Sequence, residues 1–437
     1  MPIIGLAQPA PEKRSKLTGM REPHIGQRTK TNSGLRRWRR SCAVLCLCLA
    51  GEIAASGQVL TVLTQFTGKN GANPNLLVEG RNGNFYATTG YGGPNSQGEA
   101  GTVFEISPTG VLTTLYNFCA KPNCADGLQS DAGLVLGRNG NFYGTTRIGG
   151  LAGNGTIFKV TPAGVLTTLY SFCSQTNCTD GSYPEAGLVL GSDGLFYGVT
   201  RGGGANNLGM VFSITASGAL HTVYSFAGID GSDPFGTLIQ ATDGDFYGTT
   251  MAGGPGYSSQ SAGSGTIFKI SSAGGFTTLY NFCSQANCAD GLWPETGLVQ
   301  ASDGNFYGTT TAGGSYLKAP CNANKGCGTV FKITSGGALT VLHSFKSSDG
   351  RLPMGGLLQA KDGNLYGTTS QGGKAGGTVF EITLSGALTT LHKFVRTEGF
   401  GPFAGLIQGS DGTLYGANTF GGLKANAGTV FSLTLAK

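Results

Sequence analysis

Cysteines occur in pairs along this 437-residue sequence, and their spacing limits the chemistry available to them. Eleven cysteines are present, and the eight that follow residue 58 form four local pairs: Cys119/Cys124, Cys173/Cys178, Cys283/Cys288 and Cys321/Cys327. Three of the pairs share the pattern F-C-x4-C-x-D-G. This spacing differs from the C-x2-C of zinc ribbons, and no histidine lies near any pair in the sequence. We therefore predict four disulfides and no metal site or other cofactor.

An acidic residue followed by glycine recurs in a D-G-x-x-P motif just after these cysteine positions. The motif occupies residues 180–184, 230–234, 290–294, 349–353 and 398–402, the last with Glu in place of Asp. An Asp side chain that caps a turn before a glycine is a common structural device. One acidic residue in each repeat could also supply oxygen ligands for Ca²⁺. Because a scaffold preserves such repetition whereas a site usually breaks it, we favour the turn.

Four residues break the repeat at positions where a ligand could be recognised. Arg147 and Arg201 stand where other repeats have small or apolar residues, and Tyr183 and Trp293 occupy the fourth position of the D-G-x-x-P motif. Aromatic faces near guanidinium groups can bind sugars or peptides. These four are the candidate ligand-binding residues, and ordinary variation among exposed repeat positions is the alternative explanation.

Catalytic signatures are poorly represented. The three histidines after the first 57 residues are His221, His343 and His392, and the last two stand where other repeats have tyrosine. Neither a G-x-S-x-G nor an H-E-x-x-H motif occurs. No catalytic residue is therefore assigned. Paired carboxylates from different repeats would escape notice in a sequence, so an enzyme stays open as the alternative.

All these residues belong to a repeat that fills the chain after residue 57. Each copy holds four short runs rich in Val, Ile, Thr, Phe and Tyr, separated by Gly, Asp, Asn or Pro, which is typical of strands and turns. An aromatic pair marks the register, and its tyrosine occurs seven times: Tyr86, Tyr143, Tyr197, Tyr247, Tyr307, Tyr366 and Tyr415. The intervals of 49 to 60 residues between these tyrosines define seven units.

Tight turns connect the runs within each unit. Asn139-Gly140 and Asp193-Gly194 separate the first two runs, and such dipeptides favour β-hairpins. Seven units of four antiparallel strands predict an all-β fold, a seven-bladed β-propeller with four-stranded blades. A parallel β-helix is the competing architecture, but its repeats are shorter and lack hairpin turns.

The two ends of the repeat region predict how the ring closes. Residues 60–66 (LTVLTQF) are a lone run of the fourth type, and residues 428–435 (GTVFSLTL) are a run of the third type. The last unit therefore lacks its own fourth strand. We predict that strand 60–66 fills this place in the last blade, which would remove two free sheet edges.

Strand direction predicts where a site would lie. Because neighbouring strands are antiparallel, the short Asp-Gly and Ser-Gly turns fall on one face of the ring. The long, cysteine-bearing or Gly-rich connections fall on the other. Function is usually carried by variable loops on a rigid scaffold, so we place any ligand on the long-loop face.

The first 57 residues differ from the rest in charge and hydropathy. They hold 10 of the 29 Lys and Arg but 3 of the 23 Asp and Glu, so residues 58–437 carry 19 basic and 20 acidic side chains. A body of net charge −1 offers no electrostatic surface for nucleic acid. A basic segment, an apolar run over 42–50 and small residues at 54–57 are typical of a signal peptide. We predict a leader over 1–57 and a propeller over 58–437, with an uncleaved membrane anchor as the alternative.

The repeat elements resemble a known family. GLVLGSDGLFYGVT, GTVFKIT and LTTLYSF are similar to the GloVer (Gloeo-Verruco) tandem repeat of secreted or surface bacterial proteins. The resemblance implies export and tandem repetition and brings no established catalytic residues. The D-G-N-F-Y hairpin is also similar to that of NHL-type propellers, which supports the strand order.

These observations lead to one functional hypothesis and one alternative. We expect a monomeric, secreted, periplasmic or cell-surface propeller that is not an enzyme. It would act as a binding or cell-envelope scaffold, with a carbohydrate or protein partner on the long-loop face. The alternative is a propeller enzyme, a lyase or hydrolase acting on extracellular polysaccharide.

Overall fold

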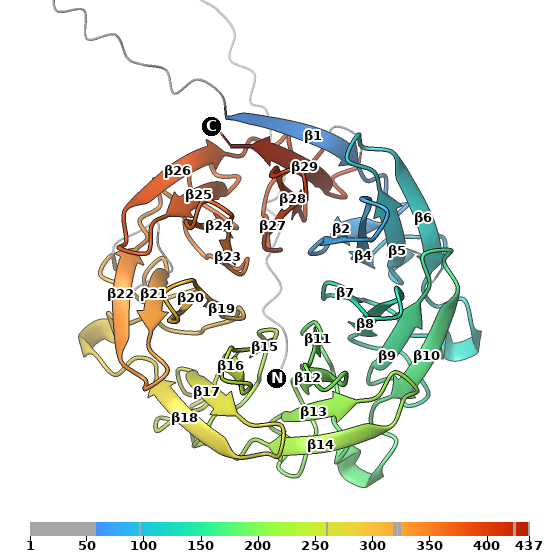
Figure 1. Cartoon of the computed structure of the whole chain (residues 1–437), viewed down its shortest axis with the longest axis horizontal. Helices are drawn as coiled ribbons and strands as arrows, with labels where there is room; N and C mark the ends of the chain where they lie inside the picture. The colour runs from blue at the N-terminus through green and yellow to red at the C-terminus, as the bar shows by residue number, and fades with distance from the viewer. Residues whose placement is uncertain are drawn as a thin grey trace, which may run out of the picture. The chain divides into compact units, whose positions relative to one another are not determined.

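The computed structural model describes residues 58–95, 98–258, 261–317, 321, 325–422 and 425–435. In this part of the chain, seven antiparallel sheets surround a common centre as the blades of a β-propeller (Figure 1). Each blade contains a path of four paired strands, which confirms the predicted fold class. The predicted leader, residues 1–57, lies outside the described residues.

Within each blade the strands lie side by side, in order from the centre of the ring to its outer edge (Figure 1). The innermost strands are β3 (Val78–Glu79), β7 (Val135–Leu136), β11 (Val189–Leu190), β15 (Ile239–Gln240), β19 (Val299–Gln300), β23 (Leu358–Gln359) and β27 (Ile407–Gln408). The second strands are β4 (Phe85–Tyr91), β8 (Phe142–Thr146), β12 (Phe196–Thr200), β16 (Phe246–Thr250), β20 (Phe306–Thr310), β24 (Leu365–Thr369) and β28 (Leu414–Asn418). The third strands are β5 (Thr102–Ile106), β9 (Thr156–Val160), β13 (Met210–Ile214), β17 (Thr266–Ile270), β21 (Thr329–Ile333), β25 (Thr378–Ile382) and β29 (Thr429–Thr434). The outermost strands are β6 (Leu112–Asn117), β10 (Leu166–Ser171), β14 (Leu220–Ser225), β18 (Phe276–Asn281), β22 (Leu339–Ser344), β26 (Leu388–Lys393) and β1 (Val59–Gln65). The first blade also has a short strand, β2 (Ala72–Pro74), that pairs with the end of β4.

The ring closes between the first and last strands of the described chain. β1 pairs antiparallel with β29, with Val62 opposite Phe431 and Gln65 opposite Thr429. The Phe66 amide continues the pairing by donating to the Gly428 carbonyl at 3.0 Å. This confirms the predicted closure, and it places a strand from the start of the chain in the seventh blade.

The Asp-Gly hairpins are held by the tyrosine that marks each repeat. In the third blade, Gly194 has a positive φ of 87°, which the tight turn requires. Asp193 accepts hydrogen bonds from the Leu195 amide at 3.0 Å and from the Tyr197 hydroxyl at 2.7 Å. Burial, together with the Asp193 carboxylate, raises the pKa of Tyr197 and keeps it protonated as a donor. Turn and tyrosine therefore form one unit, and this explains the D-G-x-x-Y spacing.

Aromatic contacts join neighbouring blades in the core. Tyr197 of the third blade lies against Phe246 of the fourth, with ring centroids 4.1 Å apart. The same contact crosses the closure, where Phe85 lies 4.2 Å from Tyr415. Further out, Phe66 meets Phe104 edge to face at 5.1 Å. Such pairs contribute about 0.5–1.5 kcal/mol beyond burial of their area, so the core lies between blades as much as within them.

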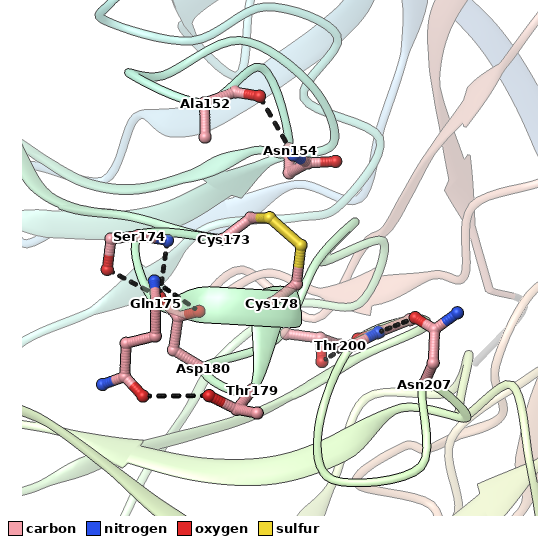
Figure 2. Close-up of a disulfide and its surroundings, with 12 residues drawn as sticks. Ala152, Asn154, Cys173, Ser174, Gln175, Cys178, Thr179, Asp180, Thr200 and Asn207 are labelled. Atoms are coloured by element: carbon pink, nitrogen blue, oxygen red, sulfur yellow. Dashed lines mark hydrogen bonds between the residues drawn. A yellow bond between two sulfur atoms is a disulfide. The ribbon is translucent and has the colours of Figure 1, made fainter.

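The four predicted disulfides are present: Cys119–Cys124, Cys173–Cys178, Cys283–Cys288 and Cys321–Cys327. Three of them enclose short 3-10 turns that the sequence did not predict, η2 (Pro122–Cys124), η3 (Thr176–Cys178) and η4 (Ala286–Cys288). Figure 2 shows the second of these loops with its disulfide. Four disulfides indicate that the protein matures in an oxidising environment.

The aspartate of the D-G-x-x-P motif is the internal cap of each such loop. In Figure 2, Asp180 accepts hydrogen bonds from the amides of Ser174 at 2.9 Å and Gln175 at 3.2 Å. The Tyr170 hydroxyl donates to the same carboxylate at 2.8 Å. Asp180 is only 1% exposed, and these donors use its oxygens. The turn interpretation is therefore confirmed for this loop.

Candidate functional site

A pocket of about 430 Å³ opens at the central channel, on the face that carries the long connections. Its volume lies in the range of small-molecule sites. All seven blades line it, each through the residue that follows the proline of D-G-x-x-P or its equivalent: Asn75, Asp131, Glu185, Phe235, Glu295, Met354 and Phe403. This set, which we call the channel ring, differs from blade to blade although the residues around it repeat.

The local backbone explains why these seven side chains converge. The residue two places before each ring residue has a left-handed backbone, with φ between 52° and 65°: Asn73, Gln129, Tyr183, Asp233, Trp293, Leu352 and Gly401. Hydrogen bonds hold this strained position. The Tyr183 amide donates to Asn154 of the preceding blade at 2.9 Å, and its carbonyl accepts from the Arg201 amide at 3.0 Å. The turn therefore directs the next residues into the channel in every blade.

One arc of the channel ring is acidic, with arginines close behind it. Arg147 Nε lies 3.6 Å from Asp131 Oδ2. Arg201 lies 3.4 Å from Glu185 and 3.9 Å from Asp233, so it links the third blade to the fourth. Neither arginine lines the pocket itself. The pocket surface therefore presents the carboxylates, and the arginines moderate their charge from outside.

Burial changes the protonation of these acids. Burial raises the pKa of Asp131 to about 7, Arg147 opposes the rise and Glu185 adds to it. Water still reaches 33% of this side chain, because the channel walls surround Asp131 without covering it. Burial also raises the pKa of Glu295, against the opposing effects of a hydrogen bond from Thr311 and the charge of Arg201. The site therefore contains carboxyl groups whose ionised forms lack full compensation.

The opposite arc of the channel ring is apolar. Met354 and Phe403 precede β23 and β27, which lie across the channel from β7 and β11 in Figure 1. Tyr91 of the first blade contributes a partly exposed ring next to this arc, whereas Phe235 of the fourth blade stands between Glu185 and Glu295 in ring order. A ligand in this pocket would meet carboxylates on one side and apolar surface on the other.

The four candidate residues from the sequence lie around the pocket but do not line it. Arg147 and Arg201 contact ring carboxylates, and Tyr183 adjoins Arg201 through their shared backbone hydrogen bond. The Tyr183 side chain is 42% exposed. Trp293 is two blades further on, with Lys325 Nζ 4.2 Å from the centre of its ring. Arg147, Arg201 and Tyr183 therefore lie near the acidic arc. A role of the four candidates in ligand binding stays a prediction.

The histidines lie at the outer edge of the blades. His221, His343 and His392 are on β14, β22 and β26, the outermost strands of their blades. His343 Nε2 lies 3.2 Å from Asp349, and His392 Nε2 lies 2.9 Å from Glu398. These contacts replace the tyrosine-to-aspartate hydrogen bond of the other blades. The two rings therefore occupy a structural position.

Sequence reasoning missed the channel ring itself. The residues that line the pocket stand directly after the repeated proline, or after Ser130 in the second copy, where successive copies from the second on read Asp131, Glu185, Phe235, Glu295, Met354 and Phe403. A column that varies in charge and size between constant neighbours is the signal that could have identified it. The sequence prediction relied instead on the position before the proline, which is occupied by Tyr183 and Trp293.

Two features are absent from the described residues. In the described ranges, no group of three or more His, Cys, Asp or Glu side chains is placed to hold a metal ion. In the same part of the chain, no helix has the length and hydropathy needed to cross a membrane.

Solved structures with similar folds include two lyases. One described as streptogramin B lyase aligns with a TM-score of 0.56 at 14% identity, over 86% of this chain and 98% of that one. Virginiamycin B lyase from Staphylococcus aureus aligns with a TM-score of 0.54 at 14% identity, over 87% and 99%. A chain of Kuenenia stuttgartiensis hydrazine synthase aligns with a TM-score of 0.53 at 14% identity, over 86% and 99%. At this identity the likeness shows the propeller fold alone.

Comparison with curated proteins finds no significant match. In contrast, the model of the Gloeobacter/Verrucomicrobia repeat matches three overlapping segments, residues 52–262, 132–319 and 257–437. Together these segments span the entire propeller, in agreement with the resemblance seen in the repeat elements. The chain therefore belongs to the Gloeobacter/Verrucomicrobia repeat family.

Proposed function

We propose that this protein is an exported, non-catalytic binding propeller that holds a small carbohydrate in the channel-ring pocket. The observation that carries the proposal is the channel ring. Seven blades repeat one backbone turn, yet together they place five different residue types in a pocket of about 430 Å³. Variation at the pocket-lining position of a repeated scaffold is what a site for one asymmetric ligand requires.

The side chains of the pocket suit a sugar. Carboxylates and the Asn75 amide can hydrogen-bond to hydroxyl groups, while Phe235 and Phe403 offer rings against which the C–H face of a sugar can lie. The pocket is enclosed by the ring of blades and is small, which favours a small ligand over the protein partner that the sequence left open. Export is supported by the four disulfides and by the signal-like composition of residues 1–57.

The proposal is tested by titration calorimetry of the mature protein against a panel of soluble mono- and oligosaccharides. Met354→Trp should fill the pocket, and the Phe at this position in the fourth and seventh blades shows that the scaffold accepts a large ring there. We expect the substitution to weaken binding at least tenfold. Val165→Trp is the matched control, since Val165 is 62% exposed in a short turn on the opposite face. Binding that persists in the Met354→Trp protein, or that is absent across the panel, would overturn the proposal.

The second candidate is a propeller enzyme acting on extracellular polysaccharide. It is favoured by the environment of Asp131, whose pKa of about 7 suits a general acid or base beside the Glu185 carboxylate and the Arg147 guanidinium. Two similar folds are also lyases by name. Product formation from a polysaccharide, abolished in Asp131→Asn, would support the enzyme. Binding without turnover would support the first proposal.

A further inference from the structure

The charge of the pocket surface is unbalanced. Asp131, Glu185 and Glu295 line it, and none of the described lining residues is Lys, Arg or His. The two nearby arginines form ion pairs with acids other than Glu295. Arg147 pairs with Asp131, and Arg201 pairs with both Glu185 and Asp233. Four carboxylates therefore face two guanidinium groups, and the charge at the channel mouth is negative when all of them are ionised.

Glu295 is the carboxylate that has no ion-pair partner, because the charge of Arg201 acts on it only from beyond ion-pair distance. Its described contact is a hydrogen bond of 3.3 Å from the Thr311 hydroxyl to Oε1. No ion pair of 4.0 Å or less in the described residues includes it. Glu295 is nevertheless half-buried in the pocket wall. A buried carboxylate with one hydrogen bond is costly to ionise, and a positive group from a ligand would offset that cost.

The surroundings of Glu295 define the rest of the ligand. In ring order it stands between Phe235 and Met354, and Phe403 follows in the next blade but one. The negative group is thus flanked by apolar side chains on both sides. A small inorganic cation would gain nothing from these neighbours, whereas an organic cation with a C–H surface would contact both kinds of group.

We propose that the natural ligand of the pocket is an organic cation, a sugar-sized molecule that carries a primary amine, such as an amino sugar. Its ammonium group would bind Glu295, within the field of Asp131 and Glu185, and its C–H face would lie against Met354 and Phe403. This inference rests on the proposed function and specifies the charge of its ligand. A neutral sugar would leave Glu295 uncompensated, and an anionic one would be repelled.

The experiment uses two pairs of probes whose members differ in charge. Glucosamine trisaccharide is compared with its fully N-acetylated counterpart, and 2-phenylethylamine is compared with 2-phenylethanol. Binding to the full propeller is measured by titration calorimetry at pH 6.0, where both amines are mainly protonated. We expect each amine to bind at least tenfold more tightly than its neutral partner.

Glu295→Gln keeps the shape of the side chain and an acceptor for Thr311 but removes the charge. We expect it to weaken amine binding about tenfold or more and to leave the neutral probes unchanged. Glu99→Gln is the matched control, because Glu99 is exposed in a long loop of the first blade and does not line the pocket. Melting temperatures of both variants establish that they are folded.

The outcomes separate this inference from the proposed function. Amine selectivity in the phenyl pair without binding of either sugar supports the charge of the ligand and overturns the carbohydrate proposal. Sugar binding with equal or higher affinity for the N-acetylated probe, unchanged in Glu295→Gln, supports the proposed function and overturns the cation. Absence of binding by all four probes overturns both.

Discussion

Asp131 should make the propeller less stable as the pH rises. Burial raises its pKa from 3.8 to about 7 in the folded protein. A raised carboxyl pKa means that ionisation opposes folding. The penalty is absent below the unfolded pKa, grows between pH 3.8 and about 7, and stays constant above that range. Asp131→Asn removes the titrating group, so the variant should be more stable than the wild type in alkaline buffer only.

The magnitude follows from the two pKa values. At about 1.4 kcal/mol for each tenfold change in proton affinity, a rise from 3.8 to about 7 corresponds to ~4 kcal/mol. Solvent reaches 33% of the side chain and screens part of this, so we expect ~2 kcal/mol above pH 8. With an unfolding entropy of roughly 0.8 kcal/mol/K for a domain of this size, the melting temperature should rise by about 2–3 °C.

The assay is thermal and urea denaturation of both proteins at pH 4.0 and pH 8.5. The variant should match the wild type at pH 4.0 and exceed it at pH 8.5. Asp303→Asn is the control of opposite sign, and Asn already occupies this position in the first two blades. Burial opposes ionisation of Asp303, but hydrogen bonds from Asn305, Tyr307 and Lys332 lower its pKa to about 2. That stabilisation is present above the unfolded pKa and is lost as the pH falls toward about 2, so this variant should be less stable at pH 8.5.

Two results would refute the reasoning about Asp131. One is an Asp131→Asn protein that is no more stable than the wild type at pH 8.5. The other is an equal gain at pH 4.0 and pH 8.5, because a pH-independent gain would come from packing rather than from the ionisation of a buried carboxyl group.

Three further predictions concern the repeated loops. Burial opposes ionisation of Asp180, but hydrogen bonds from Ser174 and Tyr170 outweigh it and lower its pKa. Asp180→Asn should therefore lower the free energy of unfolding, measured by urea denaturation at pH 7, by about 1–2 kcal/mol. An equal loss at pH 3 would contradict this cause. Replacing Cys173 and Cys178 by Ser opens a loop with a separation of five residues, so the free energy of unfolding should fall by ~2 kcal/mol while ligand affinity stays constant. His343→Tyr restores the residue of the other blades opposite Asp349; its stability should lie within about 0.5 kcal/mol of the wild type, and a loss of binding in titration calorimetry would show that this histidine has a functional role.

The position of the site agrees with the way repeats diverge. The backbone turn of the D-G-x-x-P motif is kept in every blade, even where Ser130 replaces the proline, because its left-handed residue and its backbone hydrogen bonds join each blade to the one before it. The backbone turn does not depend on the side chain of the residue after the proline, which faces the channel. This residue is therefore free to become Asp131 in one blade and Phe403 in another without loss of the ring.

Much of the architecture was predictable from the sequence for a local reason. Strand runs, the Asp193-Gly194 type of hairpin and the Cys173–Cys178 spacing are set by residues within about ten positions of one another. Each of these local patterns recurs along the seven repeats, and this recurrence makes it easier to recognise. Even ring closure could be inferred, because residues 60–66 were an outermost strand without a blade of their own.

The channel ring could not be predicted in the same way, because its members are distant in the chain and meet only when the ring closes. Asp131 and Met354 stand more than 200 positions apart, and nothing in either repeat indicates that they face one pocket. The protonation of Asp131 likewise depends on burial and on Glu185 and Arg147 from other turns of the chain. The sequence by itself determined the blades and their order, since these depend on local hydrogen bonding and alternation. Tertiary structure alone decided which side chains share the channel and what charge they present, because burial and electrostatics act through space.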